Sequence, residues 1–147
     1  MHVVSKSASE TQAIAAQLAA KLLATMPAKT ATVVALRGEL GAGKTTFAQG
    51  FARALGVLQT PRSPTFNLVK TYAIPHTKFR LWHVDCYRLD DRTDLAQLDL
   101  HTAFADQNNL VLVEWPERIG HGLPRDHVEV HMTHGPHPDA RAITLPE

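Results

Sequence analysis

The amino-acid sequence predicts an α/β fold in three layers, with a mixed parallel and antiparallel central sheet flanked by helices. Three observations predict it. The apolar, β-branched run at 31–36 is followed by a glycine-rich loop and an amphipathic helix, an order typical of α/β proteins. The strand-like segments 66–74 and 78–85 are separated by a short turn, which predicts an antiparallel hairpin. The run LVLV at 110–113 is apolar throughout, as in a strand that is covered on both faces.

The N-terminal region predicts a helix. Ser7 and Glu10 have the spacing of a capping box, and Ile14 and Leu18 continue an apolar stripe at helical spacing through an alanine-rich segment. Because proline breaks a helix interior, we expect this helix to end before Pro27.

The segment that follows the first strand predicts a second helix and then a loop. Phe47, Phe51 and Leu55 recur at helical spacing, and Gly56 is placed to end this helix. Two prolines within residues 57–65 disfavour helix in the residues before them, so this stretch predicts a loop.

The C-terminal half predicts one helix and three strands. Residues 94–108 are mainly helical in pattern, and the strand at 110–113 ends at Glu114. Segments 127–132 and 140–145 alternate with period two and are joined by a turn rich in glycine, proline and histidine. A chain of 147 residues suits one domain, which we expect to span residues 1–147.

Composition limits the function and the compartment. The 15 Lys and Arg residues nearly balance the 14 Asp and Glu residues, giving a net charge of +1, so no basic surface for DNA or for direct RNA binding is indicated. Cys86 is the only cysteine, which excludes an internal disulfide and predicts a small packing residue. No apolar stretch approaches the roughly 20 residues of a membrane span, and the N-terminus lacks a secretory signal. We expect a cytoplasmic protein without membrane contact.

The stretch GELGAGKTT, Gly38 to Thr46, predicts a nucleotide-binding loop. It fits the pattern Gly, four residues, Gly-Lys and Ser or Thr, in which successive backbone N–H groups surround the phosphates of a nucleotide. Lys44 is placed to reach the outer phosphates, and the Thr45 hydroxyl to bind Mg²⁺. The motif predicts a P-loop NTPase-like fold. The expected nucleotide-binding residues in the loop are Glu39, Leu40, Gly41, Ala42, Gly43, Lys44, Thr45 and Thr46.

Two acidic residues at strand ends are candidates for metal binding and catalysis. Glu114 follows LVLV, and ligands of open α/β sheets lie beyond the carboxyl ends of parallel strands. Asp85 ends the second strand of the hairpin and could reach the same edge. With Lys44 these acids form the predicted catalytic set, and with Thr45 the predicted metal set; which acid binds metal and which orients water stays open.

Three further residues are candidates for sensing the nucleotide state. Ser63 and Thr65 lie in the proline-stiffened stretch SPTF after the phosphate-loop helix, where nucleotide switches place residues that contact the terminal phosphate. Trp115 directly follows Glu114 and suits a docking or gating surface, or alternatively a hydrophobic cover for the sheet edge.

The histidines do not predict a metal site. His127 and His131 would share one face of a strand whose other face is apolar, so a solvated polar face accounts for them. His134 and His137 lie in or beside the following turn and are not interpreted as metal ligands either.

Four stretches in this order, GELGAGKTT, SPTFNLVKTY, HVDCYRL and LVEWPER, resemble the TsaE family, formerly YjeE, over nearly the whole chain. The resemblance implies an ATPase subunit, active with Mg²⁺, of the bacterial machinery that makes threonylcarbamoyladenosine beside the anticodon of tRNA. It implies action through a TsaD–TsaB-like protein complex, with tRNA contacted indirectly and weak hydrolysis by the isolated chain, which we expect to be a monomer.

The resemblance also carries residue roles. Asp85 and Glu114 match the essential acids of the family, Thr45 its magnesium threonine and Trp115 its tryptophan, while Thr11 matches a threonine near the nucleotide. The alternatives are a P-loop small-molecule kinase and a nucleotide-dependent binding module that does not hydrolyse ATP. A GTPase is disfavoured because the Asn-Lys-x-Asp motif that recognises guanine is missing from the sequence.

Overall fold

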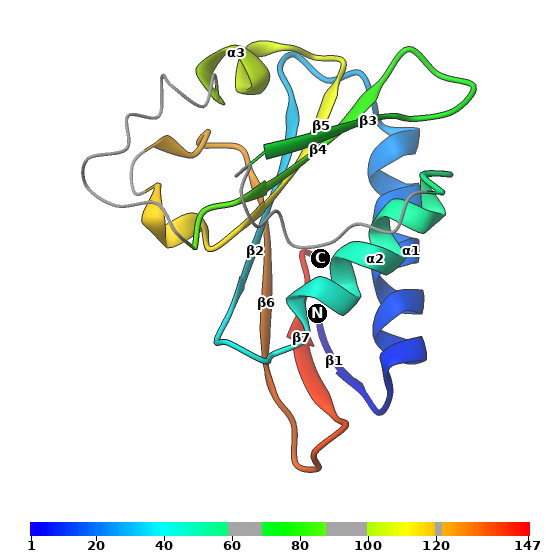
Figure 1. Ribbon diagram of the computed structural model, residues 1–147, viewed down its shortest axis with the longest axis vertical. Helices are drawn as coiled ribbons and strands as arrows, with labels where there is room; N and C mark the ends of the chain where they lie inside the picture. The colour runs from blue at the N-terminus through cyan, green and yellow to red at the C-terminus, as the bar shows by residue number, and fades with distance from the viewer. Residues whose placement is uncertain (59–68, 88–99, 120–121) are drawn as a thin grey trace.

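The computed structural model describes residues 1–58, 69–87, 100–119 and 122–147 (Figure 1). In these residues seven strands form one sheet in the order β1-β7-β6-β2-β5-β4-β3. The strands are β1 (His2–Ser5), β2 (Thr32–Gly38), β3 (Val69–Ala73), β4 (Arg80–Asp85), β5 (Asn109–Glu114), β6 (Val128–His134) and β7 (Arg141–Thr144). The helices are α1 (Ala8–Ala24), α2 (Lys44–Ala54), α3 (Leu100–Ala105) and the 3₁₀ helix η2 (Pro116–Arg118).

The sheet is mixed, as predicted: its centre is parallel and both of its sides are antiparallel. Strand β2 pairs in parallel with β5 and β6, and β4 pairs in parallel with β5. Strand β3 runs antiparallel to β4, and β7 runs antiparallel to both β6 and β1. Every residue of β5 is buried, which explains its uninterrupted apolar run.

Helices cover both faces of the sheet and give the predicted three layers (Figure 1). On one face α1 and α2 pack side by side over a core that contains Phe47, Phe51 and Leu112. On the other face α3 and η2 cover a smaller cluster that contains Val111 and Phe104. Neighbouring residues of β5 point into opposite clusters because side chains alternate along a strand.

The first helix begins as its sequence predicts. The hydroxyl of Ser7 accepts a hydrogen bond from the backbone N–H of Glu10 at 3.1 Å. The Glu10 carboxylate in turn accepts one from the backbone N–H of Lys6 at 2.7 Å, so two N–H groups at the helix start are satisfied. The helix ends at Ala24, before Pro27.

Strand β1 was not predicted from the sequence. Residues His2–Ser5 pair with β7 in the register His2↔Thr144, at one edge of the sheet. The stretch is four residues long, too short to show the alternation that identifies a strand. Its partner lies about 140 residues away in the chain, so no local signal marks the pairing.

Several predicted boundaries shift by one or two residues. Strand β2 continues to Gly38 because it pairs with β6 through Gly38↔Met132, which carries the strand into the predicted loop. Residues 100–105 of the predicted helix 94–108 are helical and residues 106–108 are not, whereas residues 94–99 lie outside the described residues. Most of the predicted loop 57–65 also lies outside them. Within the described part of the chain, no helix has the length and apolar character needed to cross a membrane.

Candidate nucleotide site

The phosphate loop leaves the end of β2 and enters α2 through left-handed backbone. Gly41 has φ 80° and Gly43 has φ 100°, values that residues with a side chain rarely adopt. The backbone N–H of Ala42 donates to the Glu39 carbonyl at 3.0 Å, which curls the loop. No side chain caps α2, whose N-cap residue is Gly43. The first turn of α2 therefore offers backbone N–H groups to an anion.

The side chain of Lys44 folds back onto this loop. Its side chain is buried, and Nζ donates to the carbonyl oxygens of Gly38 and Glu39. Nζ also lies 4.2 Å from the centroid of the Trp115 ring, within cation–π range. Burial lowers the pKa of Lys44, and the carboxylate of Glu114 opposes that shift. The loop thus holds a partly desolvated ammonium group beside its N–H groups.

The two predicted acids stand opposite each other. Asp85 and Glu114 end the parallel strands β4 and β5 and are direct register partners, so their side chains share one face of the sheet. Both residues are buried, with 8% and 3% of their surface exposed. The Asp85 carboxylate accepts a hydrogen bond from the Tyr87 N–H at 3.0 Å. Two carboxylates therefore meet at the strand end nearest the phosphate loop.

A pocket of about 370 Å³ joins the loop to the two acids. Its walls come from the phosphate loop, the ends of β4 and β5, and β7. The residues that line it are Leu40, Gly41, Gly43, Lys44, Thr45, Thr46, Asp85, Tyr87, Glu114, Trp115 and Arg141. Backbone donors, a lysine and two acids thus face one space, a combination that suits a phosphate chain with a metal ion.

The oxygen ligands in this pocket fit Mg²⁺. The Thr45 hydroxyl and the carboxylates of Asp85 and Glu114 are hard oxygen donors, which Mg²⁺ prefers. In the described residues no three His, Cys, Asp or Glu side chains converge as a metal site. These residues therefore suit an ion that takes its remaining ligands from phosphate and water, as Mg²⁺ commonly does.

Trp115 has an unusual backbone at the edge of this pocket. Its φ of 56° and ψ of 50° place a bulky residue in the left-handed region, at the point where β5 turns into η2. Its ring packs on the Tyr87 ring with centroids 5.0 Å apart. Such backbone costs of order 1–3 kcal/mol and clusters at functional sites. The structure thus holds Trp115 between Lys44 and Tyr87.

His83 was missed by the sequence analysis as a residue of the site. It lies on β4, two residues before Asp85, so both side chains share a face of the sheet. Its Nε2 lies 2.6 Å from Oε2 of Glu114, in a pair whose side chains are 2% and 4% exposed. The spacing to Asp85 was the available signal, but the pairing with Glu114 depends on the strand order.

Arg141 was also missed. Its Nη2 donates to the Gly41 carbonyl at 3.2 Å, and its Nη1 donates to the carbonyls of Pro138 and Ala140 at 2.8 Å. The guanidinium group therefore braces the phosphate loop from strand β7. Arg141 follows the loop by about 100 residues, and nothing in its local sequence marks this contact.

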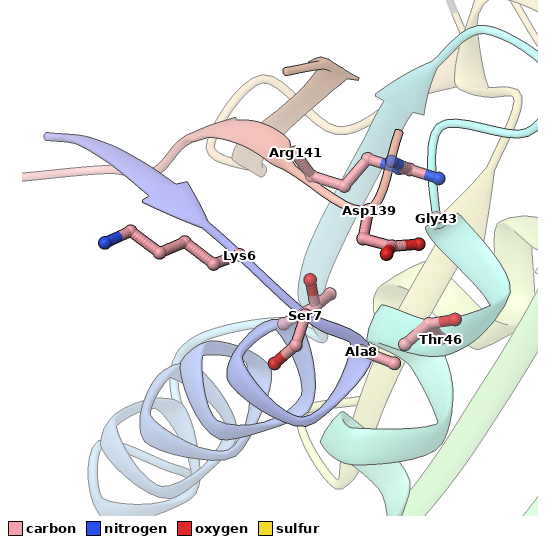
Figure 2. A pocket seen from close by; sticks show the side chains of 8 residues that line it. Lys6, Ser7, Ala8, Gly43, Thr46, Asp139 and Arg141 are labelled. Carbon is pink, nitrogen blue, oxygen red and sulfur yellow. The ribbon is translucent and has the colours of Figure 1, made fainter. Parts of the chain in front are cut away.

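A second pocket of about 210 Å³ also has Arg141 in its wall (Figure 2). In Figure 2 the side chains of Asp139 and Arg141 extend toward the start of α2, whereas that of Lys6 extends away. The residues that line it are Lys6, Ser7, Ala8, Thr11, Gly43, Thr46, Asp139 and Arg141. Gly43, Thr46 and Arg141 line both pockets, so the two form adjoining parts of one site.

The remaining predicted residues have different placements. Thr11 is buried in the wall of the second pocket, where its hydroxyl lies 2.7 Å from that of Ser5. Glu39 is exposed at the start of the phosphate loop. Ser63 and Thr65 lie outside the described residues.

Cys86, His127, His131 and His134 line neither pocket. Cys86 is fully buried in the smaller core cluster, where burial raises the pKa of its thiol to about 12, so it is a packing residue as predicted. His127 is hydrogen-bonded to Glu129 at 2.6 Å, and His131 and His134 are exposed on β6.

A glycine-rich loop between a parallel strand and a helix, with acids ending the neighbouring strands, defines the class: this is a P-loop NTPase-like protein. Within that class the chain belongs to the TsaE family. Residues 5–143 match the family model described as threonylcarbamoyl adenosine biosynthesis protein TsaE.

Individual relatives agree with this assignment. The chain is 40% identical to the tRNA threonylcarbamoyladenosine biosynthesis protein TsaE of Bacillus subtilis over 82% of this chain and 70% of the relative. It is 35% identical to the protein of the same name from Haemophilus influenzae over 86% and 77% of the two chains. The crystal structure of YdiB from Bacillus subtilis is similar, with a TM-score of 0.72, 31% identity and coverage of 99% and 83%.

Proposed function

We propose that the chain is the ATP-binding and ATP-hydrolysing subunit that supports threonylcarbamoyladenosine modification of tRNA, acting through a TsaD–TsaB-like protein complex. One observation carries the ATPase part of the proposal: Asp85 and Glu114 are register partners in the pocket that Lys44 and Thr45 also line. Family membership supports the pathway.

The two adjoining pockets bind different parts of the nucleotide. The larger one takes the phosphates, because the N–H groups of the loop and the Lys44 ammonium lie there. The smaller one takes the nucleoside, beside Thr11 and the start of α1. Arg141 lines both and offers a positive charge where they join.

The acids serve the reaction through a metal ion and water. A Mg²⁺ ion held there would supply positive charge that offsets the charge developing on the phosphates. Thr45 and one of the two acids, which line the larger pocket, would hold the ion, and the other acid would orient the attacking water. Lys44 moves from the loop carbonyls to the outer phosphate oxygens when nucleotide binds.

The contact with tRNA is indirect. A net charge of +1 gives the chain no large excess of positive charge with which to hold a polyanion, so its partners supply that surface. We infer a cytoplasmic protein that is a monomer when isolated and hydrolyses ATP slowly until the partner complex is present.

Phosphate release tests this function. We expect a low rate for the isolated chain with ATP and Mg²⁺, a clear increase on adding the purified TsaD and TsaB partners, and little activity with GTP. Release that needs a small-molecule acceptor would favour a kinase. Nucleotide binding without release above background in the full complex would favour a binding module.

A further inference from the structure

The carboxylate of Glu114 contacts the side chain of a buried histidine, His83. His83 Nε2 lies 2.6 Å from Glu114 Oε2, and neither side chain is more than 4% exposed. Glu114 lines the larger pocket, whereas His83 does not. Glu114 therefore faces the candidate site, whereas His83 contacts Glu114 from outside the pocket.

The histidine ring has one hydrogen-bonding role in the described part of the chain. Its Nδ1 is buried without a hydrogen-bond partner there, so the polar contact of the ring is the one that Nε2 makes with Glu114. A proton on Nδ1 would be buried and unsatisfied, which favours the tautomer with its N–H at Nε2. The ring is thus set to donate to Glu114.

We propose that His83 is a positioning residue, which by donating from Nε2 to Oε2 fixes the Glu114 carboxylate in the orientation that binds the nucleotide-associated metal ion. The inference rests on the proposed function, because it takes Glu114 as the acid that holds the metal ion there and assigns a partner to it. It adds a residue that lines neither pocket.

The physical reason lies in the freedom of a glutamate side chain. Glu114 has three side-chain torsions, and its ammonium neighbour Lys44 is hydrogen-bonded to loop carbonyls instead. Burying a carboxylate without a hydrogen-bond donor costs free energy. Without a fixed donor, the carboxylate could also rotate toward any donor nearby. Hydrogen bonds to metal-binding carboxylates orient them, and losing such a partner typically costs about 10–100-fold in metal affinity or activity.

Two amide variants test the contact with matched chemistry. In His83→Gln the side-chain N–H₂ reaches the place of Nε2 and can still donate to Glu114. In His83→Asn the side chain carries the same amide group as in His83→Gln. It is shorter and reaches only the place of Nδ1, so it cannot donate to Glu114. The measurement is the affinity of a fluorescent, non-hydrolysable ATP analogue, once with Mn²⁺ and once with EDTA, together with the melting temperature.

The expected result is specific to the metal. Wild-type protein binds the analogue more tightly with Mn²⁺ than with EDTA. In His83→Asn the affinity with Mn²⁺ falls about tenfold and the affinity with EDTA stays the same. In His83→Gln most of the affinity with Mn²⁺ is retained. A residue that only supports packing would change both affinities together.

Other outcomes separate the inference from the proposed function. If Mn²⁺ does not strengthen binding to the wild-type protein, the metal site of the proposed function is wrong, and the inference fails with it. If Mn²⁺ does so but His83→Asn keeps the full effect, or His83→Gln loses as much as His83→Asn, the inference alone is overturned.

A measurement on the wild-type protein needs no variant to fold. Ring ¹⁵N shifts of His83, from long-range proton–nitrogen spectra of the metal-free chain, report which nitrogen carries hydrogen. We expect a protonated Nε2. An unprotonated Nε2 would overturn the proposal, since the ring could then not donate to Glu114.

Discussion

At the scale of single residues, Lys44 is the cation that we expect to meet the phosphates in the phosphate loop. Replacing it with alanine removes charge-assisted hydrogen bonds to phosphate, each worth about 1.5–3 kcal/mol, and leaves the loop N–H groups in place. We expect Lys44→Ala to abolish tight ATP binding, with a loss of about a hundredfold in calorimetry. The exposed Lys21 on α1 gives the control, because Lys21→Ala keeps wild-type affinity. Unchanged affinity in Lys44→Ala would remove the phosphate-loop assignment.

The two acids are expected to affect hydrolysis more than binding. In Glu114→Ala and Asp85→Ala the loop and Lys44 remain, so the nucleotide affinity measured without a metal ion largely survives. Hydrolysis falls by about a hundredfold or more, the scale lost with one well-placed catalytic group. Phosphate release in the partner complex measures the rate, and calorimetry measures affinity. Normal hydrolysis by both variants would make the acids structural.

The residues of the candidate site differ in how far the sequence reveals them. Lys44 and Thr45 belong to a contiguous motif, and Glu114 directly follows an apolar run, so local pattern is enough to propose them. His83 and Arg141 gain their roles from partners 31 and 100 residues away. Those contacts arise from strand order and from the return of β7 to the loop, which no local pattern encodes.

At the scale of elements, α1 and α2 are in close contact at Gly50. A Cβ added there would lie 2.5 Å from Gln12 Cα and 2.6 Å from the Gln12 carbonyl oxygen, so the backbone of α1 would have to shift. We expect Gly50→Ala to lower the free energy of unfolding by about 1–3 kcal/mol, measured by urea denaturation. The exposed Arg53→Ala on the same helix should change it by less than about 0.5 kcal/mol. A stabilised Gly50→Ala would contradict the close contact.

An ion pair links β2 to β6. Arg37 Nε and Nη2 donate to the two carboxylate oxygens of Glu129 at 2.7 and 3.0 Å. Burial raises the pKa of Glu129, but hydrogen bonds from Arg37 and His127 outweigh it, so the folded-state pKa is lowered. The pair therefore stabilises the fold above the unfolded pKa of about 4.3, and this contribution is lost as pH falls through the folded pKa.

Replacing Arg37 tests that dependence. Both side chains are partly exposed, so we expect Arg37→Met to lower the free energy of unfolding by only about 0.5–1 kcal/mol at pH 7 and low salt. The difference from wild type should shrink as the pH falls below about 4.3 and as salt rises. In a Glu129→Gln background most of this pH dependence should disappear. A difference independent of pH would assign the effect to packing.

The elements also show where sequence patterns succeed. The central strands β2 and β5 are apolar because both faces are covered, and α1 carries its own cap, so both kinds of element were predicted. Strand β1 is a short edge strand whose existence depends on β7. Pairing across the whole length of the chain has no periodicity of its own, which is why β1 was missed.

At the scale of the whole molecule, we expect the candidate site to couple bound nucleotide to an exposed surface through Trp115. Glu114 precedes Trp115 in the chain, Lys44 lies 4.2 Å from its ring, and the half-exposed Tyr87 packs on it. A nucleotide that draws Lys44 and Glu114 toward phosphate and metal therefore changes what holds Trp115. A two-state response needs such contacts to differ between the states.

We expect the setting of this surface to differ between the ATP and ADP forms, and partner binding to select between them. Trp115 fluorescence reports it once Trp82, the only other tryptophan, is replaced by phenylalanine. Emission should differ between ADP and a non-hydrolysable ATP analogue, because only the latter carries the terminal phosphate that Thr65 is predicted to contact. The difference should shrink in Thr65→Ala. Identical spectra, together with equal affinity for the partner complex in both nucleotide states, would leave Trp115 as a packing residue and exclude this switch.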